Sequence, residues 1–151
     1  MLRTRISEAL KTAMKAKEPH IVATVRLIMA ALKDRDIAAR SKGNSDGVSD
    51  DEILSMLQSM IKQRRESIEM YEKGGRAELA EQESGEIGII ETFLPEQMDE
   101  AAVKAAIEEI VQETGASSLK DMGKVMGLLK ENFAGQMDFS KASALVKAKL
   151  V

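Results

Sequence analysis

The stretch FLPEQM, Phe93–Met98, divides this chain of 151 residues. A proline disfavours helical backbone at the residue before it, so Pro95 predicts that a helix ends immediately upstream. Apolar residues recur at helical spacing on both sides, and no segment shows the alternation that is typical of strands. We therefore predict an all-α protein. An N-terminal helical bundle, residues 1–94, is joined by a short linker, Leu94–Gln97, to a small three-helix tail domain, residues 98–151.

The N-terminal bundle is expected to contain four helices. The sequence SKGNSDGV, Ser41–Val48, is rich in turn-forming residues and predicts an exposed loop between the second and third helices. Ser49 and Glu52 have the spacing of a capping box that opens the third helix, and Gly74 ends that helix. The four expected helices cover about residues 2–16, 19–40, 49–74 and 76–93.

The tail contains the one hint of a binding site, in the stretch GASSLKDMGKVMGLL, Gly115–Leu129. Ser118 and Asp121 form a pair that resembles a capping box, so we expect a helix over Leu119–Glu131. At about 100° per residue, the apolar residues of this helix share one face. That face carries Leu119, Met122, Val125, Met126 and Leu129. A helix over about residues 100–113 precedes it, and a last helix after Asn132–Asp138 uses Ala142, Leu145, Val146 and Leu150.

Two glycines, Gly123 and Gly127, form a bare stripe at the edge of this face, with Lys120 and Lys124 just beyond them. A glycine inside a helix costs about 1 kcal/mol relative to alanine, which suggests that something comes close to the backbone there. Three occupants stay open: a second helix of the same domain, a nucleic-acid backbone whose phosphates the lysines neutralise, or another protein. A membrane dimer motif is excluded, because charged residues interrupt the segment.

The composition argues against several classes of function. The chain has no cysteine and a single histidine, His20, so the usual zinc-site spacings are absent. We find no phosphate-binding glycine loop, no nucleophile elbow and no carboxylate pair that stands out as acid and base. We therefore expect no catalysis by the chain alone, no cofactor, no metal and no membrane partner. The lack of cysteine and of a signal peptide leads us to expect a cytoplasmic protein.

Charge is distributed unevenly along the chain. Residues 1–42 carry ten Lys/Arg and four Asp/Glu, a balance of +6, whereas residues 43–97 carry five and thirteen, a balance of −8. Residues 98–151 carry seven and eight, a balance of −1. We favour the interpretation that the basic and acidic thirds face each other within one bundle. The alternative is that the basic third is a surface for RNA.

Four motifs, in their order along the chain, resemble the YqeY family of the GatB/YqeY group. The combination of the LPEQ and DMGKVM elements is specific, although each alone would be weak, and the resemblance covers nearly the whole chain. The motifs are KQRRESIEMY (Lys62–Tyr71), GRAEL (Gly75–Leu79), FLPEQM (Phe93–Met98) and GASSLKDMGKVMG (Gly115–Gly127).

The resemblance implies an all-helical N-terminal bundle and a small helical tail. This tail is similar to the C-terminal domain of the B subunit of glutamine-dependent tRNA amidotransferases. In that subunit the tail contacts the outer corner of tRNA, whereas phosphoryl transfer and amidation take place in other domains. The family is often labelled with carbon–nitrogen ligase activity that uses glutamine as amide donor. We treat this label as inherited by association, because the catalytic parts have no counterpart in this chain.

Carried over by position, the family's glycine-and-lysine face corresponds to Gly123, Lys124 and Gly127. The loop before the last helix, often Gly followed by Lys in relatives, is Gly135–Gln136 here, which puts an RNA contact at that loop in doubt. Our leading hypothesis is a non-catalytic accessory protein that binds tRNA or an aminoacyl-tRNA-processing protein through this face and Lys120. The alternatives are a protein-interaction module without RNA and a component of an amidotransferase complex.

Overall fold

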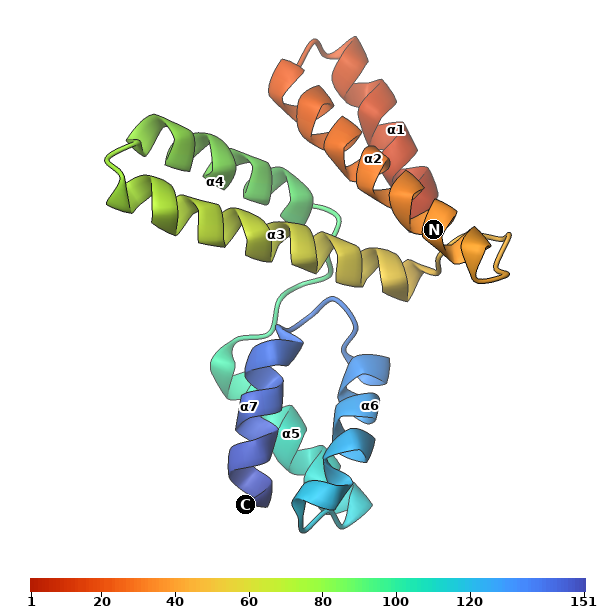
Figure 1. The fold of residues 1–151 in the computed structure, drawn as a ribbon, viewed down its shortest axis with the longest axis vertical. Helices are drawn as coiled ribbons and strands as arrows, with labels where there is room; N and C mark the ends of the chain where they lie inside the picture. The colour runs from red at the N-terminus through yellow and green to blue at the C-terminus, as the bar shows by residue number, and fades with distance from the viewer. The chain divides into compact units, whose positions relative to one another are not determined.

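The computed structural model describes all residues, 1–151, as seven α-helices and one short 3-10 turn, without strands (Figure 1). The all-α fold class predicted from the sequence is confirmed. The chain divides into two compact units, Met1–Leu94 and Pro95–Val151. Each unit encloses its own cluster of buried apolar side chains. The assignment of residues 1–94 and 98–151 as two domains stays a prediction.

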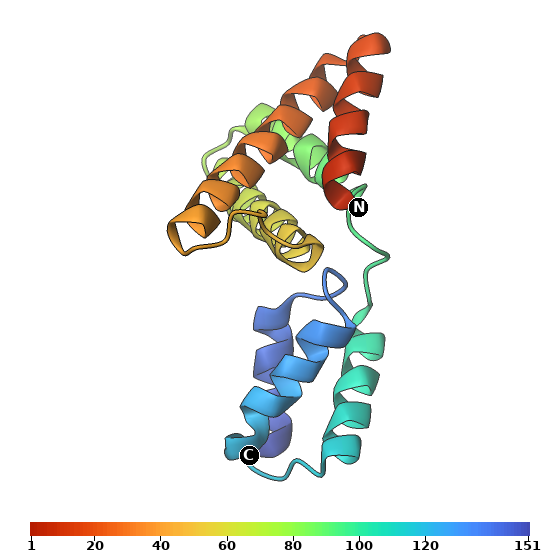
Figure 2. The ribbon, with the colours of Figure 1, turned by 90° about the vertical axis from the view of Figure 1, so that its right-hand side faces the viewer.

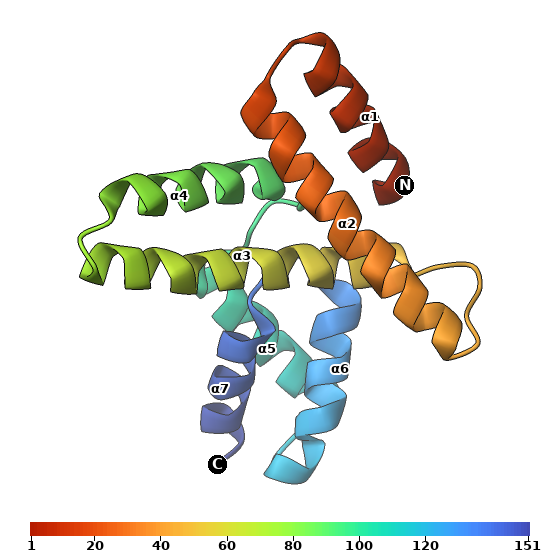
Figure 3. The same ribbon diagram turned by 45° about the horizontal axis from the view of Figure 1, so that its top comes forward.

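The N-terminal unit consists of two helical hairpins (Figure 3). Helices α1, Leu2–Lys15, and α2, Pro19–Ser41, form the first hairpin. Helices α3, Asp50–Lys73, and α4, Ala77–Glu91, form the second, and α2 packs against both of its helices. The core that joins the hairpins is almost entirely aliphatic. Its most deeply buried side chains are Ile6, Thr24, Val25, Ile28, Ile53, Met56, Leu57 and Ile90.

The first turn of α3 is capped as the sequence predicts. The hydroxyl of Ser49 accepts a hydrogen bond from the backbone N–H of Glu52 at 3.2 Å. The carboxylate of Glu52 in turn accepts from the backbone N–H of Ser49 at 3.3 Å. These two bonds satisfy N–H groups that the helix itself leaves unpaired, so they fix where α3 begins. Gly74 follows the last residue of the helix, also as predicted.

A two-pronged ion pair ties the start of α1 to the end of α2. The guanidinium of Arg3 donates to both carboxylate oxygens of Asp36, at 2.7 and 2.6 Å. Val48 joins the same cluster, because its carbonyl accepts from Arg3 at 3.1 Å and its N–H donates to Asp36 at 2.9 Å. The bonds from Arg3 and Val48 lower the pKa of Asp36 from its ordinary value of 3.8 to about 2. One carboxylate therefore holds three segments of the unit together.

Gly47 is required by this cluster. Its backbone is left-handed, with φ at +88°, and an added Cβ would lie 2.6 Å from a guanidinium nitrogen of Arg3 and 2.9 Å from a carboxylate oxygen of Asp36. Any other residue there is strained and pushes the ion pair apart. The predicted exposed loop Ser41–Val48 is thus corrected at its end, where Val48 is buried rather than exposed.

The basic and acidic thirds face each other within one unit, as the favoured interpretation predicts, because α2 packs against α3 and α4. No ion pair joins residues 1–42 to residues 43–97, since each region pairs its charges internally. Within the acidic third, Arg64 lies 2.8 Å from Glu86 and 3.8 Å from Glu83. Burial, followed by the nearby charge of Glu86, raises the pKa of Glu83. The charges of α1 and α2, apart from Arg3 and Asp36, are left to the surface.

The tail unit packs three helices around one core (Figures 1 and 2). These are α5, Glu100–Thr114, α6, Met122–Asn132, and α7, Phe139–Leu150. Asp99 caps α5 by accepting from the backbone N–H of Ala102 at 2.7 Å. Gly115 ends the helix in the left-handed conformation, with φ at +67°. The core side chains are Ala106, Ile107, Ile110, Val125, Leu129, Met137, Ala142, Val146 and Leu150.

Both ends of the predicted linker, Leu94 and Gln97, are built into the two units. Leu94 is half-buried against the core of the N-terminal unit. The side-chain amide of Gln97 donates to the carbonyl of Gly135 at 2.7 Å, and the N–H of Met98 donates to the carbonyl of Gln136 at 2.9 Å. The glutamine of the LPEQ motif therefore anchors the loop before α7, a role that its sequence position alone does not reveal.

We predict that Asp36 makes the N-terminal unit sensitive to acid. Because the folded pKa lies below the ordinary one, its stabilisation is present above about pH 4 and is lost as the pH falls through about 2. The shift corresponds to about 2 kcal/mol. Urea unfolding followed by circular dichroism at several pH values should show this loss.

The control is the difference between two variants. Asp36→Asn should remove this part of the pH dependence, whereas Asp46→Asn, in the exposed loop, should leave it unchanged. If wild type and Asp36→Asn lose stability in parallel between pH 4 and pH 2, the Arg3–Asp36 pair does not carry the acid response.

Candidate functional site

The segment before α6 begins with a tight turn. The backbone N–H groups of Ser117 and Ser118 donate to one carboxylate oxygen of Asp121, at 3.0 and 3.3 Å. These bonds lower the pKa of Asp121, and the bond from Ser117 has the larger effect. Residues Leu119–Asp121 form a 3-10 turn, and the α-helix starts only at Met122.

This turn corrects the predicted helix Leu119–Glu131 at its start. A 3-10 turn advances by about three residues per turn, so it rotates Leu119 out of phase with the α-helix that follows. Leu119, expected on the apolar face, is 49% exposed. The rest of that face is as predicted, with Val125 and Leu129 fully buried and Met122 and Met126 half-buried.

Gly123 and Gly127 lie exposed, away from the buried side of α6. An added Cβ at either position would meet no heavy atom within 4 Å. The interpretation that a second helix of the same domain packs against these glycines is therefore wrong. Their close contact with a partner stays a prediction, because no partner is present to occupy the space.

Lys120 and Lys124 flank the glycines and are exposed, and neither forms a salt bridge. The four predicted site residues thus lie within two turns of one another. We call Lys120, Gly123, Lys124 and Gly127 the α6 face. Its chemistry is two ammonium groups beside bare helical backbone, which suits an anion or a closely packed partner and supplies no nucleophile.

The tail is electrically asymmetric about α6. Residues 98–119 carry one lysine and five acidic residues, a balance of −4, whereas residues 120–151 carry six lysines and three acidic residues, a balance of +3. One ion pair links the two parts, with Lys149 at 4.0 Å from Glu108. The α6 face therefore belongs to the basic part of a unit that is acidic as a whole.

The backbone carbonyls of the Gly135–Gln136 loop accept hydrogen bonds from other residues of the tail. Gly135 is buried with φ at +75°, and its carbonyl is held by Gln97. The carbonyl of Gln136 is held by the N–H of Met98. What this loop offers a partner is limited to the half-buried side chain of Gln136.

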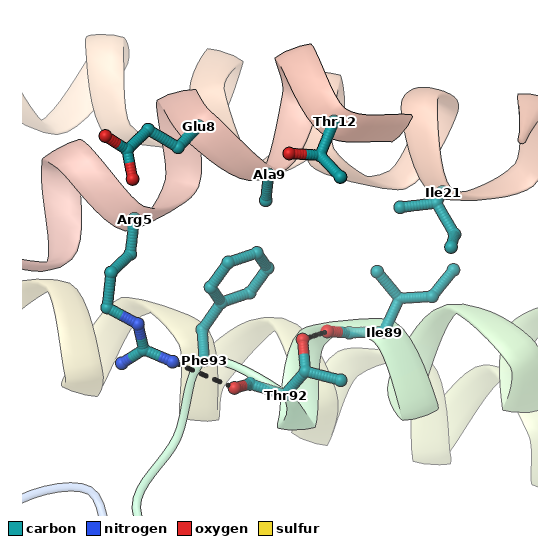
Figure 4. Close-up of a pocket in the computed structure, with 8 residues that line it drawn as sticks. All are labelled: Arg5, Glu8, Ala9, Thr12, Ile21, Ile89, Thr92 and Phe93. Carbon is teal, nitrogen blue, oxygen red and sulfur yellow. Dashed lines mark hydrogen bonds between the residues drawn. The ribbon is translucent and has the colours of Figure 1, made fainter. Parts of the chain in front are cut away.

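A groove of about 340 Å³ lies in the N-terminal unit, between α1 and the end of α4 (Figure 4). Sequence reasoning missed it, because its walls come from segments far apart in the chain. Arg5 lies over the ring of Phe93, 6.0 Å from its centroid, and donates to the carbonyl of Thr92 at 3.1 Å. The groove is lined by Arg5, Glu8, Ala9, Thr12, Ile21, Ile89, Thr92 and Phe93.

The remaining chemistry of the structure is that of a helical scaffold. No three His, Cys, Asp or Glu side chains come together in a way that could hold a metal ion. Every buried side-chain nitrogen and oxygen has a hydrogen-bond partner. A helix that crosses a membrane must be both long and apolar, and no helix of this chain meets both conditions.

A family model described as a Yqey-like protein matches residues 3–150. The chain belongs to the YqeY family. The predicted resemblance is thereby confirmed over almost the whole length.

Several curated proteins from fungi are similar to this chain. The protein named altered inheritance of mitochondria protein 41, mitochondrial, of Lachancea thermotolerans is 28% identical over 97% of this chain and 77% of its own length. The protein of the same name from Vanderwaltozyma polyspora is 27% identical over 95% of this chain and 80% of its own length. An uncharacterized protein of Schizosaccharomyces pombe is 28% identical over 63% of this chain and 73% of its own length.

These names correct the expected cytoplasmic location. The relatives that span nearly the whole chain are named as mitochondrial proteins, which contradicts the assignment to the cytoplasm. The expectation rested on the absence of cysteine and of a secretory signal peptide, and neither feature distinguishes one reducing compartment from another. The names of the relatives indicate no catalytic function.

We predict that replacing the glycines of the α6 face with alanine stabilises the tail. Open space at both positions means that the added methyl groups meet no clash, and each change should favour the helix by about 1 kcal/mol. Hydrogen exchange at α6 amides should slow in Gly123→Ala and in Gly127→Ala.

The matched control is Gly85→Ala in α4, whose Cβ also meets open space. It should slow exchange in α4 and leave α6 unchanged. Faster exchange of α6 in Gly123→Ala would mean that a neighbouring element fills the space beside the glycine.

Proposed function

We propose that this YqeY protein is a non-catalytic accessory protein that binds tRNA, or an enzyme that handles tRNA, through the α6 face. The observation that carries the proposal is the open space beside Gly123 and Gly127, flanked by two lysines that form no salt bridge in the chain. A helix that retains two unfavourable glycines without any packing need for them is suited to a close approach by something outside the unit.

The ligand chemistry follows from the same residues. The ammonium groups of Lys120 and Lys124 can pair with phosphates, and the missing side chains at the glycines let a sugar–phosphate backbone lie against the helix. Such contacts position a nucleic acid without reading its bases, so they suit recognition of a folded RNA by shape. The +3 balance of residues 120–151 supports an anionic partner.

A protein partner at the same face has its own support. Leu119 is 49% exposed and lies beside Lys120, so the edge of the face is apolar. Contact with another protein would remove the apolar surface of this leucine from water. We therefore keep a tRNA-handling enzyme beside tRNA itself as the proposed occupant.

The residues of the α6 face bind and position, and they hold no group that activates an amide or transfers ammonia. Within an amidotransferase complex, the chemistry would come from other subunits, and this chain would contribute contacts alone. The carbon–nitrogen ligase label associated with the family is compatible with the proposal in that sense.

We predict that Lys120→Ala/Lys124→Ala weakens tRNA binding while the thermal midpoint holds, because exposed lysines contribute little to folding. The slope of log affinity against log salt should fall by roughly one unit for each phosphate that the variant no longer neutralises. Fluorescence anisotropy with labelled tRNA over a salt series measures both the affinity and the slope. Lys11→Ala/Lys15→Ala on α1 removes the same charge elsewhere and should leave the slope unchanged.

We further predict that Gly123→Ala/Gly127→Ala binds tRNA more weakly although its tail is more stable than that of the wild type. A steric role of the bare backbone gives these opposite changes, whereas damage to the fold would lower both quantities. Gly85→Ala should bind tRNA as the wild type does. If wild-type protein binds no tRNA even at low salt, the RNA part of the proposal is wrong.

The purified chain should not convert Glu-tRNA to Gln-tRNA. Incubation with ATP, glutamine and misacylated tRNA, followed by analysis of the esterified amino acid, should return glutamate alone. Formation of Gln-tRNA by the pure protein would overturn the non-catalytic assignment.

A further inference from the structure

The outer side of α2 is a long helix face that nothing in the N-terminal unit covers. The inner side of this 23-residue helix packs against α1, α3 and α4 and buries Thr24, Val25, Ile28 and Leu32. Figure 3 shows α2 crossing α3. The residues turned away from the core include exposed Asp34, and six other exposed residues make up what we call the α2 outer face: Ala23, Arg26, Ala30, Lys33, Ile37 and Arg40.

These residues form two parallel lines. Ala23, Ala30 and Ile37 repeat every seven residues, and so do Arg26, Lys33 and Arg40. Seven residues are close to two helical turns, so each line runs almost along the helix axis, and the face spans about 26 Å. This is not a coiled-coil heptad, which needs apolar residues at two positions in seven, but its small and apolar line leaves room for another helix to lie against α2.

The charged line is uniformly positive and free of ion pairs. Arg26 and Lys33 have no acidic partner within salt-bridge distance, and neither does Arg40. The charge of Arg40 helps to lower the pKa of Asp36, but both oxygens of that carboxylate already accept hydrogen bonds from Arg3. Exposed Asp34 lies on the same side of α2, but three cations against this one carboxylate still leave a local surplus of positive charge that an acidic partner would neutralise.

The apolar line favours a protein over a nucleic acid. Ile37 is 50% exposed, and Leu27, on the opposite edge of the face from the cations, is 46% exposed. A phosphate backbone gains nothing from covering them, whereas a helix with apolar residues at matching positions removes their surface from water. The alanines allow such a helix to approach closely.

We infer that the α2 outer face binds an acidic amphipathic helix of a partner protein. The apolar side of the partner helix packs on Ala23, Ala30 and Ile37. The carboxylates of that helix pair with Arg26, Lys33 and Arg40. Apolar contact supplies most of the affinity, and the cations select the partner by the sign of its charge. This surface is separate from the α6 face and does not depend on the function proposed for it.

The first experiment identifies the occupant by position. A photo-crosslinking phenylalanine analogue replaces Ile37 in the full chain, within the organism that makes it, and replaces exposed Gln63 of α3 in a control. Mass spectrometry should find adducts of the Ile37 probe with an acid-rich helical segment of another protein, and none with the Gln63 probe. Adducts with nucleic acid, with a second copy of this chain or with its own tail overturn the inference, as does the absence of adducts.

The second experiment tests the charge pairing with the crosslinked segment as a synthetic peptide. The wild type should bind it with an affinity that falls as salt rises. Arg26→Glu/Lys33→Glu/Arg40→Glu should weaken binding about tenfold or more, since three exposed ion pairs are replaced by repulsion. A peptide with its acidic residues changed to lysine should recover affinity for this variant alone.

Two controls keep the result interpretable. Lys11→Glu/Lys15→Glu/Lys17→Glu changes the net charge by the same amount at the C-terminal end of α1 and should bind the original peptide almost as the wild type does. If the triple variant of α2 fails to fold, Ala30→Trp places one bulky side chain on the apolar line and should weaken binding at least as much. Equal binding by wild type and the α2 variants overturns the inference.

Discussion

The N-terminal unit depends on the ion pair between Arg3 and Asp36. Its two short hydrogen bonds join the first turn of α1 to the last turns of α2, and Val48 adds the entry to α3. Three chain segments thus meet at one partly exposed carboxylate. An exposed salt bridge usually contributes little, but this one also satisfies a backbone N–H and a carbonyl, and it sets the residue allowed at Gly47. The apolar core holds the hairpins together, and this cluster fixes the start of α1 against the end of α2 and the entry to α3.

Local chemistry made much of the fold predictable. The capping box of Ser49 and Glu52 and the glycine at position 74 defined α3, because such bonds connect residues three or four apart. The Arg3–Asp36 pair was not predictable, since 33 residues separate its members. The same reason explains why the sequence did not show which charges of the basic and acidic thirds pair. Total charges of segments do not say which side chains meet, and here the charges paired within each segment.

The sequence names the four residues of the α6 face, whose binding role stays a prediction, but it does not reveal their surroundings. The glycines and lysines of the α6 face have a spacing that the sequence displays directly. Whether the glycines were covered depended on where α5 and α7 pack, which the sequence does not state. The misplacement of Leu119 arose from a single Asp121 carboxylate that accepts from two serine N–H groups and tightens the turn. The anchoring of Gly135 by Gln97 was likewise hidden by their 38-residue separation.

The two bare glycines have a consequence for the lifetime of the protein. A helix of eleven residues with two unfavourable positions is a natural place for local opening, and locally opened segments are where proteases act first. Any partner that binds the closed helix stabilises it by mass action and so shields it from cleavage. The amount of this chain in a cell would then follow the amount of its partner, and unpartnered copies would be removed by degradation before they accumulate.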